Sequence, residues 1–101
     1  MARFTLDHAE IADFCRRHHI RRLALFGSIL RDDFGPDSDI DILVDFATGQ
    51  APGLLGIVAM EYGLAEILGL KRKVDLRTIH DLSPYFRDEV SGRAEEIYVA
   101  A

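Results

Sequence analysis

Apolar side chains at helical spacing mark the first element. Residues 7–18 place three apolar side chains on one predicted helix face, namely Ile11, Phe14 and Cys15. Asp7 precedes this pattern and Glu10 follows it three residues later, which is the arrangement of a variant capping box. The spacing therefore predicts a helix over residues 7–18 that begins at Asp7.

Alternating or continuous apolar runs predict strands at four places. These runs are residues 21–27, 39–46, 72–79 and 95–99. Between them, helical spacing over residues 53–68 predicts a second long helix, with Gly69 as its C-terminal stop. Residues 29–33 suit a short helical turn, and Ser83-Pro84 suits the start of a helix over about 85–92.

The predicted order is α-β-α-β-α-β-α-β, in which strands are separated by helices. This order favours an α/β (α+β) fold, a small mixed β-sheet with helices packed on it. The 101 residues leave room for a single domain over 1–101, and the hydrophobic fraction of 49% is that of a globular chain.

Charge and cysteine content exclude several classes of protein. A net charge of -5 argues against a broad nucleic-acid-binding surface, which needs clustered Lys and Arg. The single cysteine, Cys15, rules out an internal disulfide and favours a reducing, cytoplasmic setting. The most apolar stretch, residues 52–70, is interrupted by charged residues and glycines, so no membrane span is expected.

Two aspartates stand inside one predicted strand. Asp39 and Asp41 are two residues apart, so both side chains project from the same face. The strand itself contains no Lys or Arg, and two unpaired carboxylates on a half-buried face are costly. A divalent cation such as Mg²⁺ would offset this cost, because it prefers hard oxygen ligands. The alternative is solvated charge at an exposed strand end.

A Gly-Ser pair precedes the two aspartates in sequence and suggests a phosphate site beside them. Gly27 and Ser28 end the preceding strand just before a helical turn, where a hydroxyl and backbone amides can hold a phosphate. Such a pair also occurs in ordinary turns. The spacing Gly-Ser, ten residues, Asp-x-Asp nevertheless indicates a phosphate cradle beside a metal site.

A third acidic residue, Asp75, lies between Val74 and Leu76 on the strand predicted over residues 72–79. Together with Asp39 and Asp41 it would complete a two-metal site, and it is also a candidate general base toward an acceptor hydroxyl. The alternative is a salt bridge with Lys73 or Arg77 on the same strand face.

The pattern GS-x10-D-x-D with a later strand Asp resembles the nucleotidyltransferase superfamily of the DNA polymerase β type. More narrowly, FGSILRDDFGPDSDIDILVDF and the tail LSPYFRDEVSGRAEEIYVA resemble the minimal nucleotidyltransferase (MNT) proteins. The resemblance implies the nucleotidyltransferase fold and transfer of AMP, or another NMP, from ATP or another NTP to a hydroxyl, with two Mg²⁺ ions.

The resemblance also implies roles for individual residues. Asp39, Asp41 and Asp75 would bind metal and carry catalysis, and four residues would bind the nucleotide, namely Gly27, Ser28, Arg31 and Ser38. For Arg31 the alternative is a surface ion pair with Asp33. Many relatives carry glycine where this chain has Asp32, and the added negative charge near a triphosphate would weaken nucleotide binding.

The resemblance finally implies a partner. Minimal members pair with a helical HEPN-type toxin and act as its antitoxin, by transferring AMP to a tyrosine of the toxin. Two alternatives remain open: an inactive antitoxin that neutralises its partner by binding, and a small-molecule nucleotidyltransferase similar to those acting on aminoglycosides. Five apolar residues are candidates for partner contact, although core packing is the more usual role of such side chains: Leu54, Leu55, Tyr62, Tyr85 and Phe86.

Overall fold

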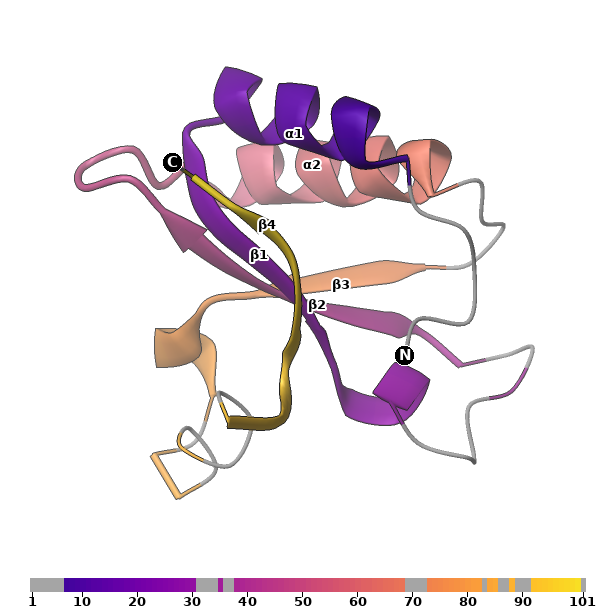
Figure 1. The fold of residues 1–101 in the computed structure, drawn as a ribbon. Coiled ribbons are helices and arrows are strands. Elements are labelled where there is room, and N and C mark those ends of the chain that lie inside the picture. Colours follow the sequence, from indigo (N-terminus) through magenta and orange to yellow (C-terminus); the bar gives the residue numbers. More distant parts are fainter. Residues whose placement is uncertain are drawn as a thin grey trace.

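A four-stranded mixed sheet carries two helices on one of its faces in the computed structural model (Figure 1). The structure describes residues 7–30, 35, 38–68, 73–82, 84–85, 88 and 92–100, and at positions 28 and 29 it describes the backbone only. The architecture confirms the predicted small mixed sheet with helices packed on it.

The strands are β1 (Ile20–Phe26), β2 (Ile40–Phe46), β3 (Val74–Arg77) and β4 (Glu95–Val99). Their spatial order is β3-β2-β1-β4, with β2 and β3 parallel and the other neighbours antiparallel. All four strands lie within two residues of their predicted bounds. β2 runs through the middle of the sheet, and its residues 41–43 have a strand neighbour on each side.

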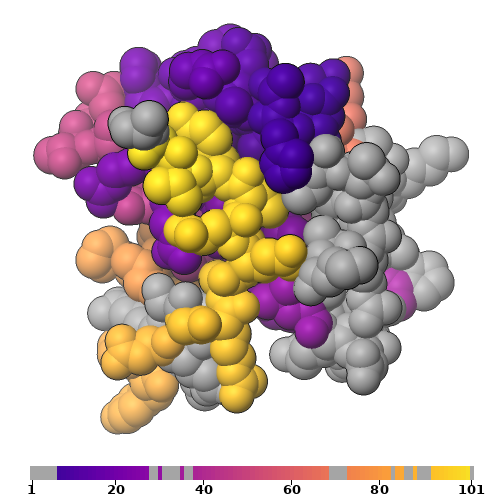
Figure 2. Space-filling view, viewed as in Figure 1, coloured from indigo at the N-terminus to yellow at the C-terminus, as the bar shows by residue number. Residues whose placement is uncertain are grey.

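The first helix, α1 (His8–Arg17), begins as its sequence predicts. The side chain of Asp7 accepts a hydrogen bond from the backbone N–H of Glu10 at 3.1 Å, which satisfies one of the free donors of the first turn. Figure 2 shows β4, in yellow, lying across the molecular surface beside this helix.

The second helix, α2 (Leu54–Ile67), follows β2 and packs beside α1. A Cβ atom on Gly63 would lie 3.0 Å from the Phe14 ring, so the glycine lets the two helices approach closely. The main core fills the space between both helices and the sheet, and Ile11, Leu25, Ile42 and Leu64 are fully buried in it. Burial of such side chains supplies most of the driving force for this fold.

The residues that the structure describes cover the opposite face of the sheet only in part. A second, small apolar cluster lies there, formed by Ala24, Phe26 and Leu43 with Ile79, Leu82 and Ala94 packed against it. Residues of β2 and β3 that alternate with the main core therefore project from this second face, and they include Asp41 and Asp75.

The connecting segments depart from prediction more than the strands do. The helical turn expected over 29–33 begins earlier, as the short 3-10 helix η1 (Gly27–Leu30). A second one, η2 (Ile79–Asp81), was not predicted; Thr78 and Asp81 form its capping box, with the Thr78 N–H donating to Asp81 Oδ2 at 2.9 Å. Gly69, the predicted helix stop, and Ser83, the predicted cap, lie outside the described residues. So does most of the helix expected over residues 85–92.

None of the helices within the described segments is both long and apolar enough to span a membrane.

Candidate functional site

Asp41 and Asp75 are neighbours across the sheet. They are register partners on the parallel strands β2 and β3, whose backbones lie about 4.8 Å apart in any sheet. Their sequence neighbours Ile40, Ile42 and Val74 point into the main core, so both aspartates project from the opposite face. Two of the three acidic residues that were expected to meet, Asp41 and Asp75, therefore lie on one face of adjacent strands, whereas Asp39 precedes β2; a centre that joins all three stays a prediction.

Gly27 packs directly against Asp41. It follows Phe26, the β1 register partner of Asp41, and has a positive φ of 76°. A Cβ atom at this position would lie 2.3 Å from Asp41 Oδ2. Only glycine can therefore bring the backbone of the η1 turn against this carboxylate, because an L side chain would both clash and strain the backbone.

Asp75 is paired with Arg77 on the same strand. Nε and Nη2 of Arg77 donate to the two carboxylate oxygens of Asp75, each at 3.1 Å, and the Asp75 side chain is 25% exposed. The pKa of Arg77 is raised, chiefly by this hydrogen bond and by the charge of Asp75. The salt bridge that the sequence left as an alternative is thus formed with Arg77.

The remaining predicted residues are placed as follows. Asp39 is exposed and lies immediately before β2. The Oγ atom of Ser38 accepts a hydrogen bond from the backbone N–H of Gly35 at 3.0 Å. The backbone of Ser28 lies in η1, next to Gly27. Arg31 and Asp33, the alternative ion pair, lie outside the described residues.

The acidic face fits a divalent cation in its donor types. Asp41 and Asp75 offer hard carboxylate oxygens on one face, and the absence of a Cβ on Gly27 leaves room for the Asp41 carboxylate against the η1 backbone. Within the part of the chain that the structure describes, no three carboxyl, imidazole or thiol groups are gathered as a complete metal site. Bound Mg²⁺ commonly completes its shell with waters and phosphate oxygens, so two protein carboxylates satisfy its requirement.

A further residue, Glu61, holds β3 in place from the helix layer. Its Oε2 accepts a hydrogen bond from the backbone N–H of Leu76 at 2.7 Å, on the outer edge of the sheet. An edge strand otherwise presents unpaired N–H groups. Sequence reasoning missed this role because Glu61 lies 15 residues before Leu76, and only the packing of α2 beside β3 joins them.

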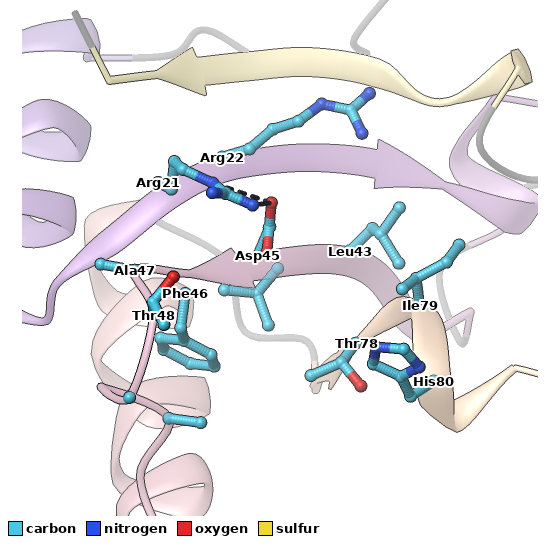
Figure 3. Close-up of a pocket in the computed structure, with 13 residues that line it drawn as sticks. Arg21, Arg22, Leu43, Asp45, Phe46, Ala47, Thr48, Thr78, Ile79 and His80 are labelled. Carbon is cyan, nitrogen blue, oxygen red and sulfur yellow. Dashed lines mark hydrogen bonds and ion pairs between the residues drawn. The ribbon is translucent and has the colours of Figure 1, made fainter.

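A groove of about 640 Å³ opens beyond the end of β3 (Figure 3). It lies between the second half of β2 with its following loop and the segment from Thr78 to His80. At its rim, Nε and Nη2 of Arg21 donate to Asp45 Oδ2 at 3.1 and 2.6 Å.

Large apolar side chains are exposed on α2. Leu54, Leu55 and Tyr62 are 78%, 86% and 76% exposed, and Val58 lies between them along the helix. The expectation that most of these side chains pack in the core is wrong for the three on α2, because the apolar stripe of this helix is broader than the face that meets the sheet. It is also wrong for Tyr85, which is exposed outside α2. Phe86 lies outside the described residues.

Comparison with known proteins gives a consistent result. A model of the nucleotidyltransferase domain matches residues 8–97. A Methanocaldococcus jannaschii protein, provisionally named a protein adenylyltransferase, is 36% identical over 81 residues, covering 80% of this chain and 83% of that protein. Protein adenylyltransferase MntA of Thermococcus cleftensis is 38% identical over 82 residues, covering 75% and 79%.

Solved structures agree on the fold. One, provisionally described as a minimal nucleotidyltransferase, is 33% identical, with a TM-score of 0.67 over 91% of this chain and 88% of that one. A toxin-antitoxin crystal structure with AMP-PNP has a TM-score of 0.69 over 94% and 75% of the two chains. At 23% identity, the second likeness concerns the fold alone.

Proposed function

Because the chain belongs to the nucleotidyltransferase family, we propose that it transfers AMP from ATP to a hydroxyl group of a partner protein, with Mg²⁺. The observation that carries the proposal is the pairing of Asp41 with Asp75 beside the Gly27 turn. Carboxylates from two strands next to a glycine-containing turn supply both halves of a phosphoryl-transfer site, one for cations and one for phosphate.

The turn that begins at Gly27 is the proposed triphosphate site. Its positive φ and lack of a Cβ bring the backbone within contact of the Asp41 carboxylate. Backbone amides at such a turn can donate to phosphate oxygens, and Ser28 adds a hydroxyl next in sequence. Arg31 and Ser38 remain proposed nucleotide contacts on the strength of the resemblance.

Asp39, Asp41 and Asp75 are the proposed ligands of two Mg²⁺ ions. When bound, such ions polarise a phosphoryl group and favour ionisation of the attacking hydroxyl. The chain's own contribution is to hold Asp41 and Asp75 in register, with Glu61 fixing the outer edge of β3. Arg77 carries positive charge to the same face and orients the Asp75 carboxylate through its two hydrogen bonds.

The proposed reaction is an in-line displacement at the α-phosphorus of ATP. The acceptor oxygen forms the new P–O bond, the bond to pyrophosphate breaks, and the acceptor proton passes to Asp75 as general base. Asp75 suits this role because its side chain is partly exposed on the open face of the sheet, where an acceptor can approach.

The proposed acceptor is a tyrosine of a helical HEPN-type toxin, which makes this chain an antitoxin. The similarity to proteins named adenylyltransferases supports a protein acceptor. The exposed residues Leu54, Leu55 and Tyr62 of α2 support a protein partner, because contiguous exposed apolar side chains typically mark interaction surfaces.

A transfer assay tests the proposal. The chain is incubated with Mg²⁺, α-labelled ATP and the protein encoded beside it, and label on the partner is followed by gel and intact mass. Transfer should occur with the wild type and fall to background with Asp39→Asn or Asp41→Asn. Asp13→Asn, an exposed α1 residue that pairs with Arg17, is the matched control and should transfer normally.

A second candidate function is neutralisation by binding alone, which the apolar surface of α2 favours. In cells that express the partner, this alternative predicts protection by an Asp39→Asn/Asp41→Asn double variant. Loss of protection by that variant, with the complex still formed, would reject it in favour of catalysis.

A further inference from the structure

The two parallel strands end at different points. β3 ends at Arg77, opposite Leu43, whereas β2 continues to Phe46 and remains paired there with β1. For its last three residues, β2 therefore has a strand on one side only. The groove described above extends to the other side, where Thr78, Ile79 and His80 line it in line with β3, and it reaches across β2 to Arg21 and Arg22 of β1.

The backbone of Phe46 faces that side. The N–H of Ile40 donates toward β3, to Lys73 O at 2.9 Å, and the N–H of Ala47 donates the opposite way, to His19 O at 2.9 Å. Because successive residues of a strand alternate the side to which their N–H and C=O groups point, Phe46 shares the direction of Ile40. Its main-chain donor and acceptor are thus directed to the groove side of β2.

The charges around the groove are already compensated. Arg21 is hydrogen-bonded to Asp45, and Arg22 to Glu96, as the dashed line in Figure 3 indicates for the first pair. A groove meant for a phosphate would need free cations, because anion binding depends on them. Apolar Leu43 and Ile79 line it instead, so main-chain and apolar recognition suits it better.

The groove lies near Asp41 and Asp75, on the side of Asp41 opposite the phosphate turn. Leu43, which lines it, follows Asp41 by two residues on the same face of β2. Gly27 directly follows the last residue of β1. The groove, in contrast, is lined by Arg21 and Arg22, which lie at the beginning of β1. The phosphate turn and the groove therefore flank Asp41 from opposite directions, and in-line displacement requires attacking and leaving oxygens on opposite sides.

We infer that this groove binds an extended segment of the acceptor protein, which adds to the end of β2 as a short strand in line with β3. Strand addition to an exposed sheet edge is a general mode of peptide recognition. The segment's hydroxyl-bearing side chain then projects toward Asp41 and Asp75. The inference rests on the proposed function, since it names where the acceptor of that reaction lies.

Peptide titration observed by NMR tests the binding mode. The probe is acetyl-Thr-Val-Tyr-Val-Thr-amide, added to the ¹⁵N-labelled chain, with a version N-methylated at alternate amides as control. We expect shifts at the amides of Phe46, Ala47 and Ile79 with the first peptide and none with the second. Equal shifts with both peptides, no shifts with either, or the same shifts with adenosine would overturn the inference.

A groove-filling variant tests its role. Ala51 is an exposed lining residue, so Ala51→Trp should obstruct the groove without disturbing the core. We expect transfer to the partner protein to fall about tenfold, equivalent to about 1.4 kcal/mol, while Mg²⁺-ATP affinity is unchanged. Ala9→Trp on the exposed face of α1 is the size-matched control and should behave as wild type.

The outcomes separate this inference from the proposed function. Peptide binding in the groove without any AMP transfer would contradict the proposed function and leave the strand-addition mode standing. Normal transfer by Ala51→Trp, with the tryptophan shown by NMR to occupy the groove, would overturn the inference and leave the proposed function standing.

Discussion

A Cβ atom on residue 27 would lie 2.3 Å from Oδ2 of Asp41. The two residues come from adjacent antiparallel strands, because Asp41 pairs with Phe26, the residue before Gly27. The phosphate turn and the acidic strand are therefore coupled by contact, and a change in one should be felt by the other.

Gly27→Ala should abolish ATP and Mg²⁺ binding. The new methyl group must push Asp41 aside, and the positive φ of 76° adds about 1–2 kcal/mol of backbone strain. Gly49→Ala is an unusually close control, since Gly49 has the same φ of 76° and no atom within 4 Å of the added Cβ.

Calorimetric ATP titration and denaturant unfolding check this pair. Backbone strain should cost both variants about 1–2 kcal/mol of unfolding free energy. Gly27→Ala should lose more because of its clash with Asp41, and it alone should lose ligand binding. Equal ATP affinity in the two variants would contradict the proposed coupling.

Arg77→Gln should raise the affinity for a divalent cation. It removes a positive charge that is hydrogen-bonded to Asp75, so a metal ion no longer competes with the guanidinium for that carboxylate. Stability should change by less than about 1 kcal/mol, because both side chains are partly exposed. Titration with Mn²⁺ in the absence of nucleotide measures the effect, and a lower affinity would show that Arg77 assists the cation instead.

Glu61→Ala should destabilise the sheet edge by about 1.5–3 kcal/mol, the usual range for a hydrogen bond to a charged group. The change removes the acceptor of the Leu76 N–H, 2.7 Å away. Hydrogen exchange should accelerate at Leu76, and Glu61→Gln should restore part of the protection. Glu66→Ala, on an exposed position of the same helix, should have little effect, and identical losses in both alanine variants would argue against the edge contact.

Cys15 should make the fold sensitive to alkaline pH. Burial raises the pKa of its thiol to about 12, from 9.0, so the native state favours the protonated form. Its contribution to stability is complete below about pH 9 and is lost as pH rises from 9 toward 12, with a slope of up to about 1.4 kcal/mol per pH unit. Urea unfolding across this range should show a shallower decline for Cys15→Ala, and parallel curves would contradict the assignment.

The regular elements could be predicted because each carries its own local signal. Alternation located β2, and the Asp7 cap located the start of α1. Asp41 and Asp75 lie side by side, which is part of the predicted meeting of three carboxylates. Their parallel register depends on the helix between the strands, so neither strand sequence alone could predict it.

The remainder depended on tertiary packing. The contact of Glu61 with Leu76 joins a helix to a strand edge, and the groove exists because β3 ends three residues before β2 does. The sequence contains the Thr78–Asp81 capping pair, but the strand predicted over residues 72–79 overlaps it, so η2 was not predicted. The exposure of Leu55 shows that apolar periodicity predicts a helix without saying which of its apolar residues face the core.

The central claim is that Asp41 and Asp75 serve one metal-dependent centre. Counting bound Mn²⁺ by electron paramagnetic resonance, with a non-hydrolysable ATP analogue present, tests it most directly. The account predicts two ions per chain in the wild type and loss of at least one in both Asp41→Asn and Asp75→Asn. An unchanged count of two in the Asp75→Asn variant would contradict it.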